Sequence, residues 1–513
     1  MLDFDDDLPD FNGDKIGRNL VDHIKGKRND ELVDINIFHA KNPINVLKRA
    51  ITTFAMLRPQ ITAALRTLID AIKLEQGPLK AALKGITNAE PDPVELNNVI
   101  GISAVPIGAL PEIINRSDVK YIDLDKQISI DDFVAPPFVL PPDIANPPLT
   151  TPLWNLERIH VPELWDKGLT GKDVKVAIVD TGINFKHPDL AKQMWDGGKF
   201  PAFAKGHGFN FGDFNHDTSD NSNGHGTKSA GIIAGNGTGN GKQAIKTGIA
   251  PGVTIMSLRI TKSTPKPDVF TTSERIYWKA LSFAVLQECD VISVSHAWKN
   301  IWRPAYWSWR VLSTIIHWAG IIHVNSAGNE YGLEGCEVPF NVGAPANCPP
   351  PWLHELQKRK PLGQLASAIA VGGSLPDKKN SIYSSGSTGP SKWLDYPYFS
   401  GLWHGLIKPD ICAPAGCLIT CSEDLDTYYT TDPTEMYGAT SGATPHVAGV
   451  AALLIEAQRK KTPGERLRPG HFLEAISYKP TIMKDQKKAK EDRYGCGLIN
   501  AYEAYQYGND KWW

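Results

Sequence analysis

Residues 437–449 read Tyr-Gly-Ala-Thr-Ser-Gly-Ala-Thr-Pro-His-Val-Ala-Gly, and they set Ser441 among small side chains ahead of an apolar stretch at 447–457. We expect this stretch to be a helix with the serine at its mouth. A serine hydroxyl is a weak nucleophile, so chemistry at Ser441 requires a general base, a group that orients the base, and donors for an oxyanion. The rest of the chain has to supply candidates for these roles.

Three motifs ahead of the serine supply such candidates. A strand-like apolar run ends at Asp180, and a small-residue helix is expected to begin in the motif Asn-Gly-His-Gly-Thr at 223–227, which holds His225. Asn329 lies in the motif Asn-Ser-Ala-Gly-Asn-Glu at 325–330. Open α/β sheets place functional groups at the carboxyl ends of their strands, and helix N-termini present free N–H groups.

This ordered set resembles the active site of the subtilisin-like serine proteases (subtilases, peptidase family S8), whose triad follows the order Asp, His, Ser. The resemblance covers residues 154–505 and includes framework segments at 248–251, 370–373, 383–385, 408–414 and 494–500. One Asp-Thr-Gly alone would be weak evidence, because unrelated proteins carry it, whereas the ordered set is specific. The resemblance implies an α/β fold of three layers with a mostly parallel central sheet, in a peptidase domain at 153–513.

The resemblance also implies a role for each candidate. Ser441 would attack the scissile carbonyl, His225 would take its proton and return it to the leaving amine, and Asp180 would hold the imidazole in the required tautomer. The side-chain amide of Asn329 and the backbone N–H of Ser441 would bind the oxyanion. The alternative readings are structural. Asp180 would then only end a strand, and His225 or Ser441 would only begin a helix. Asn329 would belong to an ordinary Gly-Asn turn.

Two positions beside the nucleophile differ from the family pattern. Ala439 stands where the family usually has glycine, and Gly442 stands where it usually has methionine. Neither change removes a catalytic group.

A larger departure concerns the segment along which a substrate backbone lies in the family. Its usual glycines are replaced in the run Val-Ser-His-Ala-Trp at 294–298, so Ala297 and Trp298 add side chains there. We therefore predict a reshaped specificity pocket and a selective protease. The alternative is a rebuilt loop from which Trp298 packs outward. The candidate substrate-binding residues are Ser295, His296, Ala297, Trp298, Ala327 and Gly328.

The residues ahead of the peptidase region predict a smaller α+β unit at 31–130, after an acidic tail at 1–30. Its expected elements are strands at 34–38, 99–105 and 119–125, a helical region at 43–83 divided at Pro59, and a short helix at 108–116. This arrangement resembles the propeptide of secreted subtilases, which implies an intramolecular chaperone and inhibitor. A Pro-rich linker at 131–152 follows, and self-cleavage is expected between about Gln127 and Pro152. The alternative is an accessory domain that is never removed.

Composition indicates a globular chain without a strongly charged partner. The 513 residues are 42% hydrophobic and 21% charged, and 54 basic against 56 acidic residues give a net charge of −2. These values predict neither a nucleic-acid-binding surface nor a membrane span. Residues 1–10 are acidic and lack the basic and apolar regions of a secretory signal, which favours a cytoplasmic protein. A secreted protein is the alternative, because a chain trimmed behind a new start methionine would look the same.

The expected chemistry requires no cofactor, although one loop offers a candidate cation site. Asp213, Asn215 and Asp217 alternate along the chain, a spacing that can wrap calcium. Some subtilases carry calcium in a similar loop. The sequence lacks the glycine and the terminal glutamate of an EF-hand, so a solvated polar loop is the alternative.

The seven cysteines leave at least one thiol unpaired within the chain. Cys336 and Cys348 flank a loop and could form a disulfide in an oxidising compartment. Cys412, Cys417 and Cys421 cluster without a fourth ligand at zinc-like spacing, so no zinc site is expected.

These inferences lead to one expected function and two alternatives. The expected protein is a serine endopeptidase that forms an acyl-enzyme on Ser441 and is made as a self-inhibited precursor. Its partners are protein or peptide substrates and its own N-terminal segment. The first alternative is a dedicated processing protease, or a transpeptidase, of narrow specificity. The second is a non-catalytic binding protein of the same fold.

Overall fold

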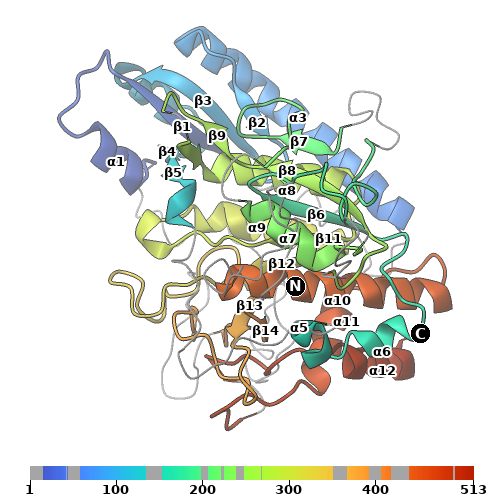
Figure 1. The fold of residues 1–513 in the computed structure, drawn as a ribbon. Helices are drawn as coiled ribbons and strands as arrows, with labels where there is room; N and C mark the ends of the chain where they lie inside the picture. Colours follow the sequence, from blue (N-terminus) through green and yellow to red (C-terminus); the bar gives the residue numbers. More distant parts are fainter. Residues whose placement is uncertain are drawn as a thin grey trace.

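A computed structural model of the chain shows two parts packed together, a front part that ends at residue 133 and a larger part that begins at residue 153 (Figure 1). The structure describes residues 15–41, 43, 58–133, 153–197, 206–220, 224–237, 248–266, 268–349, 367–391, 406–416, 438–488 and 491–512. No helix in these ranges combines the length and the apolar character that crossing a membrane requires.

The larger part is organised around a seven-stranded sheet in the order β14-β13-β12-β11-β6-β8-β7, and every described pairing in it is parallel. In chain order the strands are β6 (Lys175–Asp180), β7 (Gly208–Asn210), β8 (Thr254–Arg259), β11 (Val291–Val294), β12 (Ile322–Ser326), β13 (Ile369–Ser374) and β14 (Ile411–Pro414). Nearly all their residues are buried, as expected when helices cover both faces of a parallel sheet. The predicted α/β fold is confirmed.

Helices form a layer on each face of this sheet. They are α5 (Trp154–Arg158), α6 (Pro162–Trp165), α7 (His225–Ala234), α8 (Glu274–Leu286), α9 (Tyr306–Trp318), α10 (Ala439–Lys461), α11 (Pro469–Tyr478) and α12 (Ala501–Lys511). Along β6, Val176 and Ile178 join a hydrophobic cluster with residues of α7, α10, α11 and α12. Ala177 and Val179 join another, with α8 and α9. Because successive side chains of a strand point to opposite faces, the sheet lies between these two layers.

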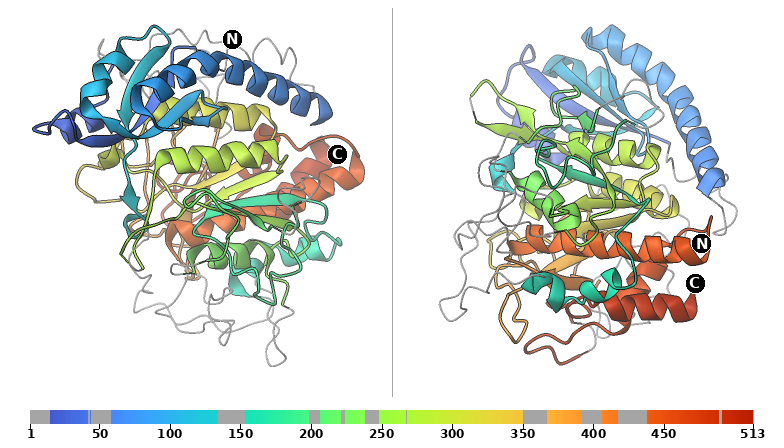
Figure 2. Two further views of the ribbon diagram at one scale, coloured as in Figure 1. Left: turned by 90° about the horizontal axis from the view of Figure 1, so that it is seen from above. Right: turned by 45° about the vertical axis from the view of Figure 1, so that its right-hand side comes forward.

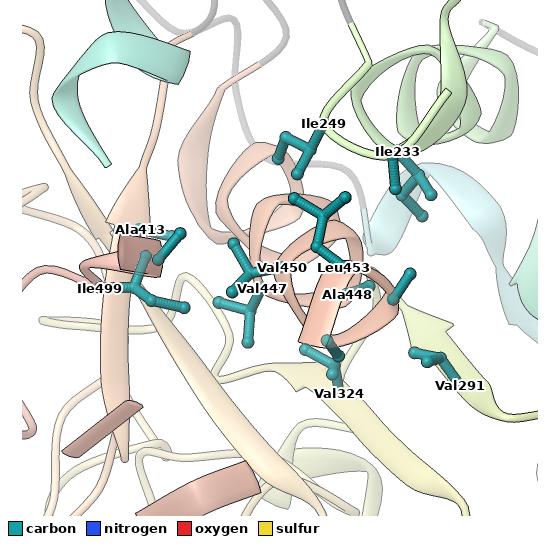
Figure 3. Packing of buried hydrophobic residues seen from close by; sticks show 14 of the residues in the cluster. Ile233, Ile249, Val291, Val324, Ala413, Val447, Ala448, Val450, Leu453 and Ile499 are labelled. Atoms are coloured by element: carbon teal, nitrogen blue, oxygen red, sulfur yellow. The ribbon is translucent and has the colours of Figure 1, made fainter. Parts of the chain in front are cut away.

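Helix α10 runs through the centre of the first cluster. Every residue from its start to position 458 is buried, which fits a helix that is apolar or small on all sides. Figure 3 shows Leu453 near Ile249, while Val447 and Val450 lie on the side of Ala413. The helix starts well before the predicted stretch at 447–457, so Ser441 lies inside its first turn rather than ahead of it.

The front part is an antiparallel sheet in the order β2-β3-β1-β4 with helices on it, so the predicted α+β unit is present. Its elements are α1 (Arg18–Ile24), β1 (Leu32–His39), α3 (Arg58–Thr87), β2 (Asp92–Val94), β3 (Val99–Pro106), a 3-10 turn η1 (Ile107–Ala109), α4 (Leu110–Ile114) and β4 (Val119–Leu124). Pro59 stands at the start of α3, where its missing N–H is tolerated. The rest of the predicted helical region, at 44–57, lies outside the described residues. Leu20 of α1, in the predicted acidic tail, is fully buried.

The front part rests on the side of the larger part that carries α8 and α9 (Figure 2). Phe38 of β1 lies edge-on to Trp278 of α8, with ring centroids 6.2 Å apart. Leu68, Val94 and Val99 of the front part belong to the same cluster as α8 and α9. One continuous apolar core therefore joins the two parts.

Ala439, the first residue of α10, has a left-handed backbone with φ of 58°. This conformation costs a residue other than glycine roughly 1–2 kcal/mol. We predict that Ala439→Gly raises the free energy of unfolding in urea by about 0.5–1 kcal/mol, after subtraction of the extra chain entropy of an unfolded glycine.

Ala443 is the matched control, because it lies within the same buried helix and has no positive φ. Ala443→Gly should lower the free energy of unfolding by about 1 kcal/mol. Equal destabilisation by both substitutions would contradict the interpretation of Ala439 as strained.

Candidate active site

An aspartate and a histidine meet at the carboxyl edge of the central sheet. Asp180 is the last residue of β6, and His225 is the first residue of α7. His225 Nδ1 lies 2.7 Å from Asp180 Oδ1, and both side chains are buried. The turn into α7 is made by Gly224, whose φ of 72° favours glycine. The end of β6 therefore fixes Asp180, and the start of α7 fixes His225.

Several groups hold the Asp180 carboxylate in its ionised form. Burial by itself opposes ionisation, but the imidazoles of His225 and His296 and a backbone N–H outweigh it, so the pKa of Asp180 lies below its ordinary value. That N–H belongs to Thr181 and donates to Oδ1 over 2.8 Å, while the Ser229 hydroxyl donates to Oδ2 over 3.3 Å. Because Asp180 engages Nδ1 of His225, Nε2 lies on the opposite side of the ring, where a proton can be exchanged.

Ser441 exchanges two hydrogen bonds with Ser295, the residue that follows β11. The Ser441 hydroxyl donates to the carbonyl oxygen of Ser295 over 2.9 Å, and the Ser295 hydroxyl donates to the carbonyl oxygen of Ser441 over 3.1 Å. The second bond replaces a helical one, because Pro445, one turn further along α10, has no N–H to donate to that carbonyl. The start of the helix is thereby locked to the end of the strand.

Asn329 is tied to the same helix start. Its Oδ1 accepts from the backbone N–H of Thr440 over 3.2 Å and from the Thr440 hydroxyl over 2.8 Å. With the oxygen engaged, the Nδ2 group is left as a donor, and it reaches no acceptor within the described ranges. The N–H of Ser441 belongs to the first turn, whose N–H groups lack intrahelical partners. The Asn329 side-chain amide and the backbone N–H of Ser441 are therefore two hydrogen-bond donors near Thr440.

The two predicted substrate-binding residues ahead of Asn329 shape its loop. Ala327 is fully buried, and its N–H donates to the carbonyl of Val371. Gly328 has φ of 108°, and a Cβ there would collide with the carboxylate of Glu330 and the hydroxyl of Ser387. That hydroxyl donates to Glu330, whose pKa is raised by burial. Glu330 and Ser387 therefore support the loop that carries Asn329, a role that the sequence analysis did not predict for either residue.

His296, another predicted substrate-binding residue, lies against the pair of Asp180 and His225. Its ring stacks on the ring of His225, with centroids 4.6 Å apart and an interplanar angle of 24°. Its Nε2 lies 3.8 Å from Asp180 Oδ1. Burial lowers the pKa of His296 to about 4, so the ring is neutral at physiological pH.

Trp298 points into the protein and not outward. Its side chain is almost fully buried, and its backbone N–H and carbonyl both pair with Ala344. The rings of Tyr277 and Trp302 surround it, with centroids 5.6 Å and 5.7 Å away. Ala297 is buried beside it. The rings of Tyr277, Trp298 and Trp302 thus form an aromatic surface next to His296.

The front part reaches this aromatic surface through its last described residues. Strand β5 (Ile128–Ser129) pairs antiparallel with β10 (Phe270–Thr272), which precedes α8. Phe133 then lies against Trp298 and Trp302, with ring centroids 5.2 Å and 4.6 Å apart. Sequence reasoning did not identify Phe133, and the only available signal was an aromatic residue at the start of the Pro-rich linker.

An arginine closes the candidate cation loop. Arg259 lies 3.6 Å from Asp213 Oδ2 and 3.7 Å from Asp217 Oδ2. Asp213 also accepts from the N–H and the hydroxyl of Ser263, and Asn215 Oδ1 accepts from the N–H of Asp217. These oxygens already face donors, so the arrangement fits a polar loop better than a calcium cage. Calcium binding here stays an untested prediction.

No disulfide joins Cys336 to Cys348 in the described part of the chain, and both side chains are buried. Burial raises the pKa of the Cys412 thiol far above its ordinary value. Cys417 and Cys421 lie outside the described residues.

Comparison with known proteins places this geometry in a family. Thermitase of Thermoactinomyces vulgaris is 28% identical over 359 residues, which cover 68% of this chain and 95% of thermitase. The minor extracellular protease Vpr of Bacillus subtilis strain 168 is 29% identical over 285 residues, 53% of this chain and 31% of Vpr. The major intracellular serine protease of the same organism is 33% identical over 142 residues, 27% of this chain and 39% of that protein. The chain thus spans well under half the length of two of these relatives.

The subtilase family model matches residues 171–497, which is more than half of the chain. The matched range contains the seven parallel strands, α7 and α10, and with them Asp180, His225, Asn329 and Ser441. The protein therefore belongs to the subtilase family of serine endopeptidases.

Proposed function

We propose that this protein is a serine endopeptidase that hydrolyses peptide bonds through an acyl-enzyme on Ser441. The observation that carries the proposal is the buried hydrogen bond between Asp180 and His225. This hydrogen bond lies at the carboxyl edge of the central sheet. At the same edge, two hydrogen bonds join Ser295 to Ser441 in the first turn of α10. A buried aspartate that is hydrogen-bonded to a histidine and has a lowered pKa is typical of functional sites, which favours an enzyme over a non-catalytic protein of the same fold.

The proposed reaction assigns one step to each of these polar groups. The Ser441 hydroxyl turns from the Ser295 carbonyl to Nε2 of His225 and gives up its proton as Oγ attacks the scissile carbonyl carbon. Asp180 stabilises the imidazolium that forms, and His225 then protonates the leaving amine. Water attacks the acyl-enzyme by the reverse sequence, with His225 again taking and returning the proton.

The oxyanion of each tetrahedral intermediate would lie between the Asn329 side-chain amide and the N–H of Ser441. Thr440 supports this role because it engages the amide oxygen of Asn329 and so aims Nδ2. Donors that are fixed before the reaction need no reorganisation when the charge develops.

The proposal includes a precursor that the front part holds inactive. β-Strand addition is a common way for an extended peptide to bind a protein. The pairing of β5 with β10 and the insertion of Phe133 among Trp298 and Trp302 support such binding by the chain's own segment. An incoming substrate would have to displace these contacts.

Ion pairs at α8 set the position of the front part. Arg275 lies 2.7 Å from Asp125 Oδ2, and Lys279 lies 2.6 Å from Asp92 Oδ1. The guanidinium of Arg275 also lies so close to Gly101 of β3 that a Cβ there would collide with it. Such partly buried pairs add more to specificity of docking than to its strength.

The aromatic surface favours an enzyme of narrow specificity, so a dedicated processing protease is the second candidate function. Phe133 fits edge-on or tilted against its neighbours in the geometry that aromatic pairs prefer. A substrate side chain of similar shape would make the same contacts.

The catalytic assignment predicts distinct losses for the two proposed roles. Ser441→Ala should abolish labelling by a fluorophosphonate and lower kcat by about 10⁶-fold, a magnitude known for subtilisin. Asn329→Ala should keep the labelling site but lower kcat by about 10²–10³-fold with little change in KM, again by analogy with subtilisin. Steady-state kinetics on the enzyme freed of its front part measures both. Asn347→Ala is the control, because its amide donates to the carbonyl of Val342 elsewhere in the same region, and it should retain kcat. Normal turnover by Ser441→Ala would refute the assignment.

The precursor predicts self-cleavage that depends on the nucleophile. Intact-mass spectrometry of the purified wild-type chain should show loss of the front part, with a new N-terminus between Gln127 and Pro152. The Ser441→Ala variant should stay at full length. A full-length wild-type chain that still labels at Ser441 would instead establish the front part as a permanent domain.

The aromatic surface predicts a preference for large apolar or aromatic side chains at one position of the substrate. Trp298→Gly should weaken this preference about tenfold, because each lost aromatic contact is worth about 0.5–1.5 kcal/mol. Profiling of a peptide library with both enzymes measures the change. Uniform cleavage by the wild-type enzyme would show that the pocket does not select.

A further inference from the structure

His296 is a buried polar side chain that has no hydrogen bond within the described ranges. Its side chain is completely inaccessible, and neither ring nitrogen has a partner there. Burying an unpaired polar group costs roughly 1–3 kcal/mol, which an aliphatic side chain of similar size would avoid. This cost does not by itself assign a role, because His323 is buried in the same way, and it is the contacts of His296 that distinguish the two residues.

The contacts of His296 direct it at the catalytic pair. Its ring stacks on the His225 ring with centroids 4.6 Å apart, and its Nε2 lies 3.8 Å from the Asp180 oxygen that accepts from His225. That distance is too long for a hydrogen bond. Because the two rings are nearly parallel, His296 lies over the hydrogen-bonded pair of Asp180 and His225 and forms no hydrogen bond with either of them.

The ring of His296 is itself held from the other side. Phe133 and Tyr277 both meet it edge-on, with centroids 5.6 Å and 6.2 Å away and interplanar angles of 82° and 87°. Its backbone carbonyl accepts from Nδ2 of Asn325 over 2.9 Å. These contacts leave the ring little freedom to tilt.

We propose that His296 is a positioning residue for the catalytic base, holding the plane of the His225 ring by stacking on it. This inference rests on the proposed function, because it assigns His225 the role of base. When His225 takes the proton of Ser441, the stacked neutral ring faces a cation, which is a favourable arrangement. His296 does not touch the reacting atoms.

Through its contacts, His296 also connects the aromatic surface to His225, the proposed base. After the front part leaves, a substrate side chain in the place of Phe133 packs against the far edge of His296. Part of the binding energy of this contact then holds His225 in its reactive orientation. An aromatic substrate side chain at the position of Phe133 is therefore expected to raise kcat as well as to lower KM.

The test compares three variants. His296→Leu removes the stacked ring, while His296→Phe keeps a ring and loses the nitrogens. His323→Leu is the matched control, because His323 of β12 is likewise buried with no partner for either ring nitrogen in the described part of the chain. We expect His296→Leu to lower kcat about 100-fold, the cost of a misplaced catalytic group, with a smaller change in KM. His296→Phe should fall between it and the wild type, and His323→Leu should match the wild type.

A spectroscopic readout separates positioning from general damage. The proton between His225 Nδ1 and Asp180 should give a low-field ¹H NMR signal that moves or broadens in His296→Leu and stays unchanged in His323→Leu. The His296→Phe variant gives the same readout if the leucine variant does not fold. Because this signal does not depend on turnover, it tests His296 even if Ser441 proves unreactive, which would defeat only the proposed function.

The proposal is overturned if the signal and kcat of both His296 variants match those of His323→Leu and only KM changes. His296 would then be no more than a wall of the pocket. The same conclusion would follow if the His296 variants lost kcat only with an aromatic substrate and left the low-field NMR signal unchanged.

Discussion

The register of two neighbouring parallel strands is the constraint on which the rest of the site depends. β6 and β11 pair with Val179 beside Val294, so Asp180 and Ser295 leave the sheet side by side, one strand spacing of about 4.8 Å apart. Asp180 then fixes His225, and Ser295 fixes the first turn of α10 through its exchange of hydrogen bonds with Ser441. The pair of Asp180 and His225 and the first turn of α10 are thus both anchored to the same sheet.

Much of this frame could be predicted because each functional residue stands in a motif with its own local geometry. Apolar runs ended by a polar residue indicate strands with functional carboxyl ends. Gly224 and Gly328 take the positive φ values that turn the chain just before His225 and Asn329. Local signals do not contain the order of strands in the sheet, because that order depends on which long-range pairings form. The family resemblance implied a mostly parallel central sheet but no order of its strands.

The residues that sequence reasoning missed or misplaced are those whose positions are set by distant packing. His296 was expected as a pocket wall, and its stacking on His225 depends on a helix from another part of the chain. Phe133 belongs to the front part, yet its neighbours follow β11, and no spacing rule connects them. The early start of α10 was missed because Gly442 and Pro445 are weak helix formers. In the structure, the hydroxyl of Ser295 compensates for the N–H that the proline lacks.

The two kinds of contact between the parts would have different consequences for the release of the front part from the precursor that we propose. Apolar contacts such as Phe38 on Trp278 supply most of the attraction, while pairs such as Arg275 with Asp125 fix the register. While the chain is continuous, the front part rebinds at the high effective concentration that a covalent connection provides. One cleavage in the linker removes that advantage and leaves every contact intact. In the proposed precursor, release would then be governed by dilution and by competition for the position of Phe133. A substrate side chain that takes this position would displace the front part and contact His296.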